Sequence, residues 1–351
     1  MKILIFTDNF SLPIDEGRRK VTYYLMTTLS KKEEVLTICN NSERTPDGVK
    51  KIKTNRLLIS LRLKKEISIF KPDLILYIPS SSATIYSFMR AAILKKYGNN
   101  AKIVVIAHSG PINYKKHHRI LLRLFSSYFS QDAILTPSPQ LYDQLKKHRF
   151  NMRLVPFGVD VNKFKPADHK RKSELRKKYS VEKDAFVVLH VGHITKSRNL
   201  EIFSEIQKID GVQTLIISSE SVPKDKHIFK SLKNSGVKLI TNYMDNIEEI
   251  YQLSDCYVFW GGAISMPLSV FEAMACNLPV ITNKFGILPI LFHEGRGFIY
   301  CESNRDIIDK IIQIKNSSNR EIGTRALVEQ YSWDKLVEII CKIYIIVPYD
   351  T

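Results

Sequence analysis

The sequence predicts an α/β protein with two doubly wound domains, each built on a parallel sheet. The chain has 351 residues, and a prior of about one domain per 100–200 residues gives two domains. Short β-branched runs alternate with helical stretches, which is typical of parallel sheets. This alternation occurs twice, once in each half of the chain.

The N-terminal half supplies the first set of elements. We predict strands at residues 3–7, 34–39, 74–78, 103–107, 133–136 and 153–156. Helices are predicted from about residue 17, near residues 83–96 and near residues 140–147. Strands and helices that alternate in this way form one doubly wound domain.

The C-terminal half repeats this plan. We predict strands at residues 186–191, 214–218, 237–240, 256–259 and 279–282, with helices starting near residues 198, 226, 247 and 268. Further helices are predicted near residues 305–315, 320–330 and 333–345. Residues 165–172 are polar and unpatterned, which predicts a linker. Open parallel sheets bind ligands beyond the carboxyl ends of their strands, so we expect two facing sheets with a ligand cleft.

Composition and charge narrow the class of protein. Hydrophobic residues make up 44% and charged residues 25%, which excludes a disordered tail, a collagen and a coiled coil. The net charge is +18, and residues 1–165 carry 29 Lys and Arg against 12 Asp and Glu. Such a basic half attracts anionic lipid, nucleic acid or a phosphorylated acceptor. Its densest patch, Tyr114 to Phe129, fits either a basic amphipathic helix at a membrane or a packed helix with solvated cations.

Other features bear on location and metal binding. No apolar run approaches the ~20 residues that span a bilayer, and residues 1–8 lack a signal-peptide core and cleavage site. The five cysteines are odd in number and widely spaced, which argues against a disulfide framework or a zinc ribbon. No Asp-x-Asp motif or histidine cluster has metal-ligand spacing. We therefore expect a cytoplasmic protein that uses no metal and no cofactor.

Six segments together resemble the retaining glycosyltransferases of family 4, which have the GT-B fold of two Rossmann-like domains facing across a cleft. The most specific is Ser269-Val-Phe-Glu-Ala-Met-Ala-Cys-Asn-Leu-Pro-Val-Ile-Thr282, similar to the family's Glu-Ala-Met-Ala-x-Gly-x-Pro-Val-Ile signature. The others lie at residues 8–20, 106–110, 136–138, 155–166 and 190–200. The resemblance implies an acceptor-side domain at 1–165, a nucleotide-sugar domain at 166–331, and a C-terminal helix at 332–351 that packs back on the first domain.

The signature segment implies a donor site at the start of a helix. Free N–H groups there attract a diphosphate through hydrogen bonds and the helix dipole. Four residues occupy this turn: Met266, Pro267, Leu268 and Ser269. Glu272 lies one turn deeper, where the family binds the nucleotide ribose. The alternative is that Ser269-x-x-Glu272 is a capping box that serves only the helix.

Other segments imply the remaining site residues. In the family, Arg and Lys neutralise the leaving diphosphate, and His193 and Arg198 stand at these positions. Arg grips phosphate oxygens bidentately. Gly17 would allow close backbone approach, and His108 matches a strand-end histidine that faces the transferred sugar. Two positions depart from the family: Ile264 and Ile290 stand where it has carboxylates, and Ile264 replaces the first Glu of the Glu-x7-Glu motif.

The resemblance implies a retaining hexosyltransferase that moves a sugar from a UDP- or GDP-linked donor to an acceptor hydroxyl. Catalysis would rest on His108, Arg198 and Glu272. The expected acceptor is a lipid-linked or cell-surface glycan, and the basic domain suggests peripheral contact with an anionic membrane from the cytoplasmic face. Two alternatives remain: a degenerate GT-B protein that binds nucleotide sugar without transfer, or a basic protein that binds or modifies nucleic acid. No Gly-x-Gly-x-x-Gly follows a predicted strand, which argues against a dinucleotide oxidoreductase.

Overall fold

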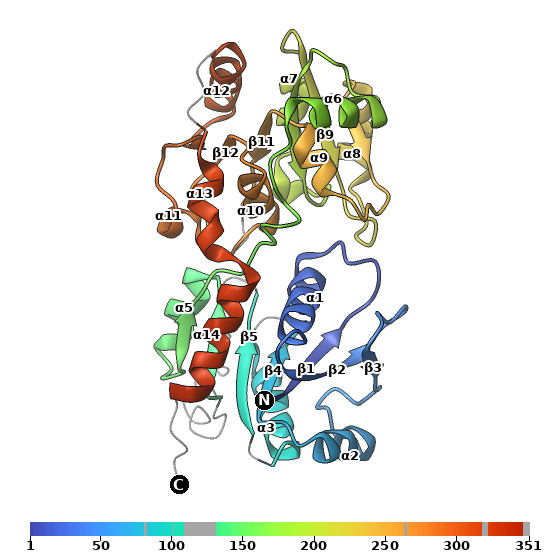
Figure 1. The fold of residues 1–351 in the computed structure, drawn as a ribbon, viewed down its shortest axis with the longest axis vertical. Coiled ribbons are helices and arrows are strands. Elements are labelled where there is room, and N and C mark those ends of the chain that lie inside the picture. Colours follow the sequence, from blue (N-terminus) through green and yellow to red (C-terminus); the bar gives the residue numbers. More distant parts are fainter. Residues whose placement is uncertain (81–82, 100, 109–130, 263–264, 318–321, 347–351) are drawn as a thin grey trace. The chain divides into compact units, whose positions relative to one another are not determined.

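The structure is a computed structural model of the chain (Figure 1). It describes residues 1–80, 83–99, 101–108, 131–262, 265–317 and 322–346. These residues form two compact units. Unit 1 comprises residues 1–158 and the segment from Trp333, and unit 2 comprises residues 159–332. The basic segment Tyr114 to Phe129 and Ile264 lie outside the described residues.

Unit 1 contains a seven-stranded sheet in which every described pairing is parallel. The strand order is β3-β2-β1-β4-β5-β6-β7. The strands are β1 (Lys2–Asn9), β2 (Glu34–Asn41), β3 (Val49–Lys51), β4 (Leu74–Ile78), β5 (Lys102–Ile106), β6 (Ala133–Thr136) and β7 (Met152–Leu154). The order reverses between β1 and β4, and doubly wound sheets bind ligands at such a switch point.

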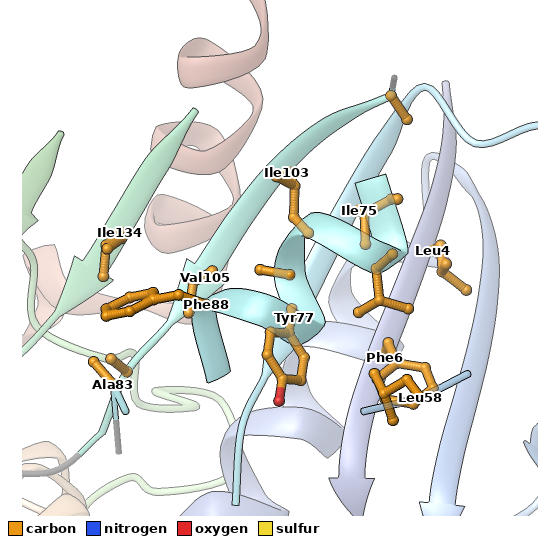
Figure 2. Close-up of a cluster of buried hydrophobic side chains, with 14 of the residues drawn as sticks. Leu4, Phe6, Leu58, Ile75, Tyr77, Ala83, Phe88, Ile103, Val105 and Ile134 are labelled. Atoms are coloured by element: carbon orange, nitrogen blue, oxygen red, sulfur yellow. The ribbon is translucent and has the colours of Figure 1, made fainter. Parts of the chain in front are cut away.

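Helices cover the sheet of unit 1. They are α1 (Gly17–Leu29), α2 (Leu61–Phe70), α3 (Ile85–Tyr97), α5 (Pro139–Lys146) and α14 (Trp333–Ile346). Every residue of β4 and β5 is buried, as expected for parallel strands packed on both faces. Figure 2 shows Phe88 of α3 with Val105 of β5 in one apolar cluster. The same cluster includes Leu58 and Phe6.

The last helix, α14, packs on α1. Trp333 stacks on Tyr24 with ring centroids 4.9 Å apart. At the other end, the buried Lys102 donates its Nζ to the carbonyl oxygen of Tyr344 at 2.6 Å. Unit 1 is therefore assembled from two pieces of chain that are far apart in the sequence.

Unit 2 contains a six-stranded parallel sheet in the order β10-β9-β8-β11-β12-β13. Its strands are β8 (Phe186–Val191), β9 (Val212–Ile217), β10 (Lys238–Ile240), β11 (Cys256–Phe259), β12 (Val280–Thr282) and β13 (Phe298–Tyr300). The switch point lies between β8 and β11, which are hydrogen-bonded neighbours. The prediction of two doubly wound parallel-sheet domains is confirmed.

The helices of unit 2 are α6 (His169–Lys178), α7 (Ile202–Ile206), α8 (Lys226–Asn234), α9 (Glu248–Leu253), α10 (Leu268–Ala275), α11 (Leu288–Leu291), α12 (Asn304–Asn316) and α13 (Thr324–Val328). Short 3-10 turns occur at Lys196–Arg198 and Glu329–Tyr331. The helix predicted from residue 198 therefore starts four residues later. Arg198 lies in the preceding turn instead.

The predicted linker 165–172 is wrong in its second half, because α6 begins at His169. The Asp168 side chain caps this helix by accepting from the Arg171 N–H at 2.7 Å. Its buried face includes Arg176, whose guanidinium pairs with Asp255. Because this helix buries a cation that pairs with a carboxylate far along the chain, its sequence lacks the apolar periodicity that predicts a helix.

Candidate functional site

The carboxyl ends of β8 and β11 form the switch point of unit 2. The loop after β11 contains Gly261, which exchanges two hydrogen bonds with Asn283 from the end of β12. The Gly261 N–H donates to Asn283 Oδ1 at 3.3 Å, and Asn283 Nδ2 donates to the Gly261 carbonyl at 3.1 Å. These two hydrogen bonds hold Gly261, after β11, against Asn283, after β12.

Arg198 brings a partly buried cation to this point. Its guanidinium carbon lies 5.0 Å from the ring centroid of Phe259, the last residue of β11. Its Nη1 is buried and has no hydrogen-bond partner among the described residues. Burial lowers the pKa of Arg198. A buried donor without an acceptor is costly, so the guanidinium is suited to an anionic ligand.

Tyr257 of β11 links the start of helix α10 to the end of β8, and it also interacts electrostatically with Arg198. The Tyr257 hydroxyl lies 2.7 Å from Ser269 Oγ in the first turn of α10 and 3.3 Å from the Val191 carbonyl at the end of β8. Burial raises the pKa of Tyr257 well above its usual range, and the Arg198 charge opposes that rise. The phenol therefore stays protonated and ties β8 to α10.

The capping-box alternative for α10 is wrong. The N-cap residue is Pro267, and within the described part of the chain no side chain caps the helix. Ser269 is the second helical residue, and its hydroxyl is engaged by Tyr257 instead. The first N–H groups of α10, at Leu268 and Ser269, therefore receive no capping bond from a side chain of the described residues, and such groups suit an anionic ligand.

Glu272 is buried one turn into α10, with 4% of its surface exposed. Its Oε2 accepts a hydrogen bond from the Tyr251 hydroxyl of α9 at 2.7 Å. Burial and the charge of Glu272 raise the pKa of Tyr251 far above its usual range. The sequence reasoning missed both tyrosines, because their partners lie 12 and 21 residues further along the chain.

Two histidines flank the turn after β8. His193 Nδ1 lies 2.6 Å from Ser219 Oγ, at the end of β9. His190 is fully buried, and its Nδ1 lies 3.0 Å from the Val258 carbonyl oxygen. Burial lowers the pKa of His190 to about 3, so it is neutral at physiological pH. A Cβ on Gly192 would lie 2.9 Å from His190 Nε2, so only glycine fits there without a shift.

The turn after β12 closes this region. Phe285 stacks on Phe259 with centroids 5.3 Å apart. The Ile287 N–H donates to the Ser265 carbonyl at 3.0 Å, and Ser265 Oγ is buried without a partner in the described residues. Ile290 stands where the family 4 glycosyltransferases have a carboxylate, and it is 56% exposed.

In unit 1, His108 follows β5 at the carboxyl edge of the sheet. Its ring lies 4.7 Å from that of Phe157. Burial, with the nearby charge of Arg18, lowers the pKa of His108 to about 3. Its Nε2 is buried and meets no hydrogen-bond partner among residues 1–108 and 131–346 as far as they are described. His108 is therefore a neutral imidazole whose Nε2 has no hydrogen-bond partner among the described residues.

Gly17 is the first residue of α1, next to Glu16 and Arg18. A Cβ on Gly17 would contact no described atom within 4 Å, so the fold does not require glycine there. The Arg18 guanidinium binds the Ser80 carbonyl and Glu16 Oε1. Arg18 therefore places a cation near His108, and the sequence reasoning did not single it out.

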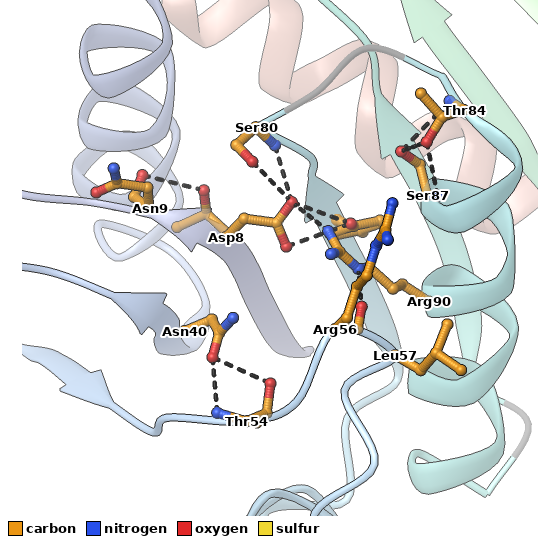
Figure 3. Close-up of polar contacts among 12 residues, drawn as sticks. Asp8, Asn9, Asn40, Thr54, Arg56, Leu57, Ser80, Thr84, Ser87 and Arg90 are labelled. Atoms are coloured by element: carbon orange, nitrogen blue, oxygen red, sulfur yellow. Dashed lines mark hydrogen bonds and ion pairs between the residues drawn. The ribbon is translucent and has the colours of Figure 1, made fainter.

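A second unpredicted cluster lies at the switch point of unit 1 (Figure 3). Asp8 at the end of β1 accepts from Arg90 Nη1 at 2.8 Å and from the Ser80 N–H at 2.9 Å. The Tyr77 hydroxyl lies 3.3 Å from the same carboxylate oxygen. Arg90 also donates its Nε to the Arg56 carbonyl at 2.7 Å. These bonds join β1, β4 and α3 at the edge where a ligand would bind.

The described residues limit the chemistry. They include no group of three or more His, Cys, Asp and Glu side chains that could hold a metal ion. No helix among them is long and apolar enough to cross a bilayer. All five cysteines are free thiols.

Unit 2 combines the Arg198 cation, the N-terminus of α10 and the buried Glu272 carboxylate. Together these groups suit a phosphorylated ligand with hydroxyl groups.

Solved structures share this fold. Anabaena HepE, solved with UDP and glucose, matches with a TM-score of 0.76 and 16% identity over 99% of this chain and 100% of that one. Sucrose-phosphate synthase of Thermosynechococcus elongatus matches with a TM-score of 0.74 and 16% identity over 98% of both chains. The two doubly wound sheets are thus those of a GT-B protein. Residues 171–332 match the family described as Glycosyl transferases group 1.

The alignments with curated relatives cover only part of each protein. Alpha-monoglucosyldiacylglycerol synthase of Acholeplasma laidlawii is 23% identical over 217 residues, 56% of this chain and 54% of that protein. N-acetyl-alpha-D-glucosaminyl L-malate synthase of Bacillus anthracis is 24% identical over 265 residues, 70% of this chain and 68% of that protein. The matches therefore span about half to two thirds of the length of these relatives.

Proposed function

We propose that this protein is a retaining glycosyltransferase that moves a sugar from a nucleotide-diphosphate sugar to an acceptor hydroxyl. The observation that carries the proposal is the Arg198 guanidinium, whose buried Nη1 lacks a partner in the described chain, near the uncapped start of α10. The match of residues 171–332 to the Glycosyl transferases group 1 family supports the same reaction class. A diphosphate would complete both features at once.

The proposed mechanism stabilises the departing diphosphate. As the bond to the sugar breaks, negative charge grows on the leaving phosphate oxygen. Arg198 and the first N–H groups of α10 are already in place to meet that charge, so the protein need not reorganise during the reaction. His193 stands on the turn after β8 as a further donor to the phosphates. No step in this scheme requires a metal ion or a cofactor.

Two further residues would orient the donor. Glu272 is buried and held by Tyr251, and its carboxylate would accept hydrogen bonds from ribose hydroxyls. His108 is neutral, and its unpartnered Nε2 would bind a hydroxyl of the transferred sugar without adding charge. Gly17 would let the backbone approach the same substrate.

The relatives support a class of donor and a class of acceptor. HepE was solved with UDP and glucose, which supports a UDP-linked hexose, and GDP is the other candidate. Relatives include the diacylglycerol-lipid synthase of Acholeplasma laidlawii and an Escherichia coli galactosyltransferase named for an undecaprenol-linked acceptor. We propose an acceptor in lipid-linked or cell-surface glycan synthesis.

The first test is thermal unfolding of the protein with UDP, GDP, ADP, their sugar conjugates and NAD. A ligand at about 100 times its dissociation constant stabilises by ~2.7 kcal/mol, so the cognate nucleotide should raise the melting temperature by several degrees. NMR of the product made from the matching sugar donor should then show the anomeric configuration of the donor.

Other results of these tests would favour one of the two alternatives: a nucleotide-sugar-binding protein without transfer activity, or a nucleic-acid-binding protein. Donor binding without transfer or hydrolysis would make the chain a degenerate nucleotide-sugar-binding protein, as the exposed Ile290 suggests. No shift with any nucleotide, together with salt-sensitive DNA binding, would favour the nucleic-acid alternative. Inversion of the anomeric centre would contradict a retaining reaction.

A further inference from the structure

The outer face of α2 exposes large apolar side chains that the fold does not use. Leu61 is 87% exposed and Ile69 is 67% exposed. Ile59, two residues before the helix, is 58% exposed. Leaving such side chains in water is unfavourable by about 25 cal/mol per Å² of apolar surface, so a cluster of this kind marks an interaction surface.

The orientation of α2 is set by its caps and its buried face. Ser60 caps the first turn by accepting from the Leu63 N–H at 3.2 Å, and Lys71 ends the helix in the left-handed conformation. Leu63 and Ile67 are fully buried in the unit 1 core. Leu61 and Ile69 therefore stay outside, because the helix cannot rotate without exposing its buried pair.

Basic residues share the outer face with these apolar side chains. Arg62, Lys64 and Lys65 are all exposed. Residues 44–71 contain nine Lys and Arg against two acidic residues, Asp47 and Glu66. Glu66 is paired with Lys50 at 2.8 Å. The surface around the exposed leucine and isoleucine is therefore strongly positive.

A cavity of about 610 Å³ adjoins this face near the C-terminal ends of α2 and α3. Its lining includes Lys64, Lys71 and Lys96. Asp73 also lines it, and one oxygen of that carboxylate accepts from the backbone N–H of Lys2 at 2.6 Å. Three ammonium groups around one hollow suit a phosphate group.

We propose that the α2 outer face, consisting of Leu61, Arg62, Lys64, Lys65 and Ile69, docks on an anionic lipid bilayer. Its apolar side chains would enter the acyl boundary while its cations meet lipid phosphates. Charge complementarity selects this occupant: a second copy would oppose lysine to lysine, and the exposed leucine and isoleucine add nothing to contacts with nucleic-acid phosphates. These five residues lie outside the sequence segment Tyr114 to Phe129, and docking needs no donor binding in unit 2.

The test is sedimentation of the full chain with vesicles of phosphatidylcholine alone or mixed with phosphatidylglycerol. Only the anionic vesicles should retain the protein, and retention should fall with salt. We expect Lys64→Glu with Lys65→Glu to weaken binding by about tenfold or more, since each basic residue near the surface contributes roughly fivefold. Leu61→Ser with Ile69→Ser should weaken it similarly.

Matched controls come from unit 2. Lys170→Glu with Lys177→Glu reverses two exposed lysines of α6, and Ile312→Ser changes an apolar side chain that is 38% exposed on α12. These variants should bind vesicles like the wild type, and all variants should keep the nucleotide-induced melting shift. Equal losses in the controls, or unchanged binding by both α2 pairs, would overturn the proposal. So would a change of oligomeric state in the Leu61/Ile69 pair with vesicle binding intact, or duplex-DNA binding in place of vesicle binding.

Discussion

Arg198 stands out among the arginines of unit 2 because its Nη1 is buried and has no hydrogen-bond partner among the described residues. The neighbouring Phe259 ring offers a cation–π contact, which is worth ~0.5–2 kcal/mol and does not replace a hydrogen bond to Nη1. Such a residue stores unfavourable free energy that an anion would release. In the proposed donor site, a cation that is already desolvated would bind the diphosphate without a further cost of desolvation.

We predict that Arg198→Met will weaken binding of the cognate nucleoside diphosphate by about 10- to 100-fold, since a hydrogen bond to a charged group contributes ~1.5–3 kcal/mol. The melting temperature without ligand should stay the same or rise, because an unpaired buried charge is removed. Titration calorimetry and thermal unfolding measure the two effects. Lys196→Met, an exposed cation on the same turn, is the control. A destabilised variant with normal affinity would make Arg198 a structural cation.

The buried histidines predict a pH effect on stability. The pKa of His190 is lowered to about 3 by burial, from 6.5. Between these values the unfolded chain binds a proton that the folded chain excludes, so the free energy of unfolding falls as the pH drops below 6.5. The slope is at most ~1.4 kcal/mol per pH unit for one histidine.

We therefore expect His190→Gln to flatten the dependence of the urea unfolding midpoint on pH between 7.5 and 5.5, whatever its effect on stability at pH 7.5. The exposed His169, replaced by Gln, serves as the control and should leave the slope unchanged. An unaltered slope in the His190 variant would contradict the prediction.

At the scale of elements, the turn after β8 depends on Gly192. His190 cannot move aside easily, since its ring is fully buried and its Nδ1 lies 3.0 Å from the Val258 carbonyl oxygen. We predict that Gly192→Ala will destabilise unit 2 by ~1–3 kcal/mol through overpacking and will weaken nucleotide binding by displacing His193. Urea unfolding and the nucleotide-induced melting shift measure these effects. Gly262→Ala is the control, because its Cβ would contact no described atom within 4 Å.

The sequence predicted the elements with strong local patterns. Apolar β-branched runs predicted β1, β4, β5 and β8 because parallel strands are buried on both faces. The short strands β3 and β13 were not predicted, although β7, β10 and β12 have the same length and were predicted. Helix α2 was not predicted either. The polar α6 was interpreted as a linker, because the pairing of Arg176 with Asp255 is invisible in local sequence.

The same limit applies to the site. The motif around α10 predicted where Ser269 and Glu272 lie in the chain, since both sit on one local helix. It did not predict Tyr257 or Tyr251, which reach these residues from another strand and another helix. Contacts of that kind depend on how elements pack, and local patterns do not encode packing. The roles assigned to the site residues remain predictions.

At the scale of the whole molecule, unit 1 is completed by the end of the chain. Trp333 is 4% exposed and stacks on Tyr24. We predict that Trp333→Ala will destabilise unit 1 by ~3–5 kcal/mol. Hydrogen exchange should then accelerate in β1 and β5 while the amides of β8 and β9 keep their wild-type rates. Acceleration confined to β8 and β9 would contradict the division into these units.

The division of unit 1 into two pieces also bears on synthesis at the ribosome. Residues 159–332 lie between them, and the Val159 N–H donates to the Tyr331 carbonyl at 2.9 Å, so unit 2 closes on itself where the chain enters and leaves. At ~5–20 residues per second, translating this stretch takes roughly 10–35 seconds. During that interval the Tyr24 face of α1 has no α14 to cover it. Nascent unit 1 is therefore a candidate client for chaperones that shield apolar surface, until α14 emerges and covers it.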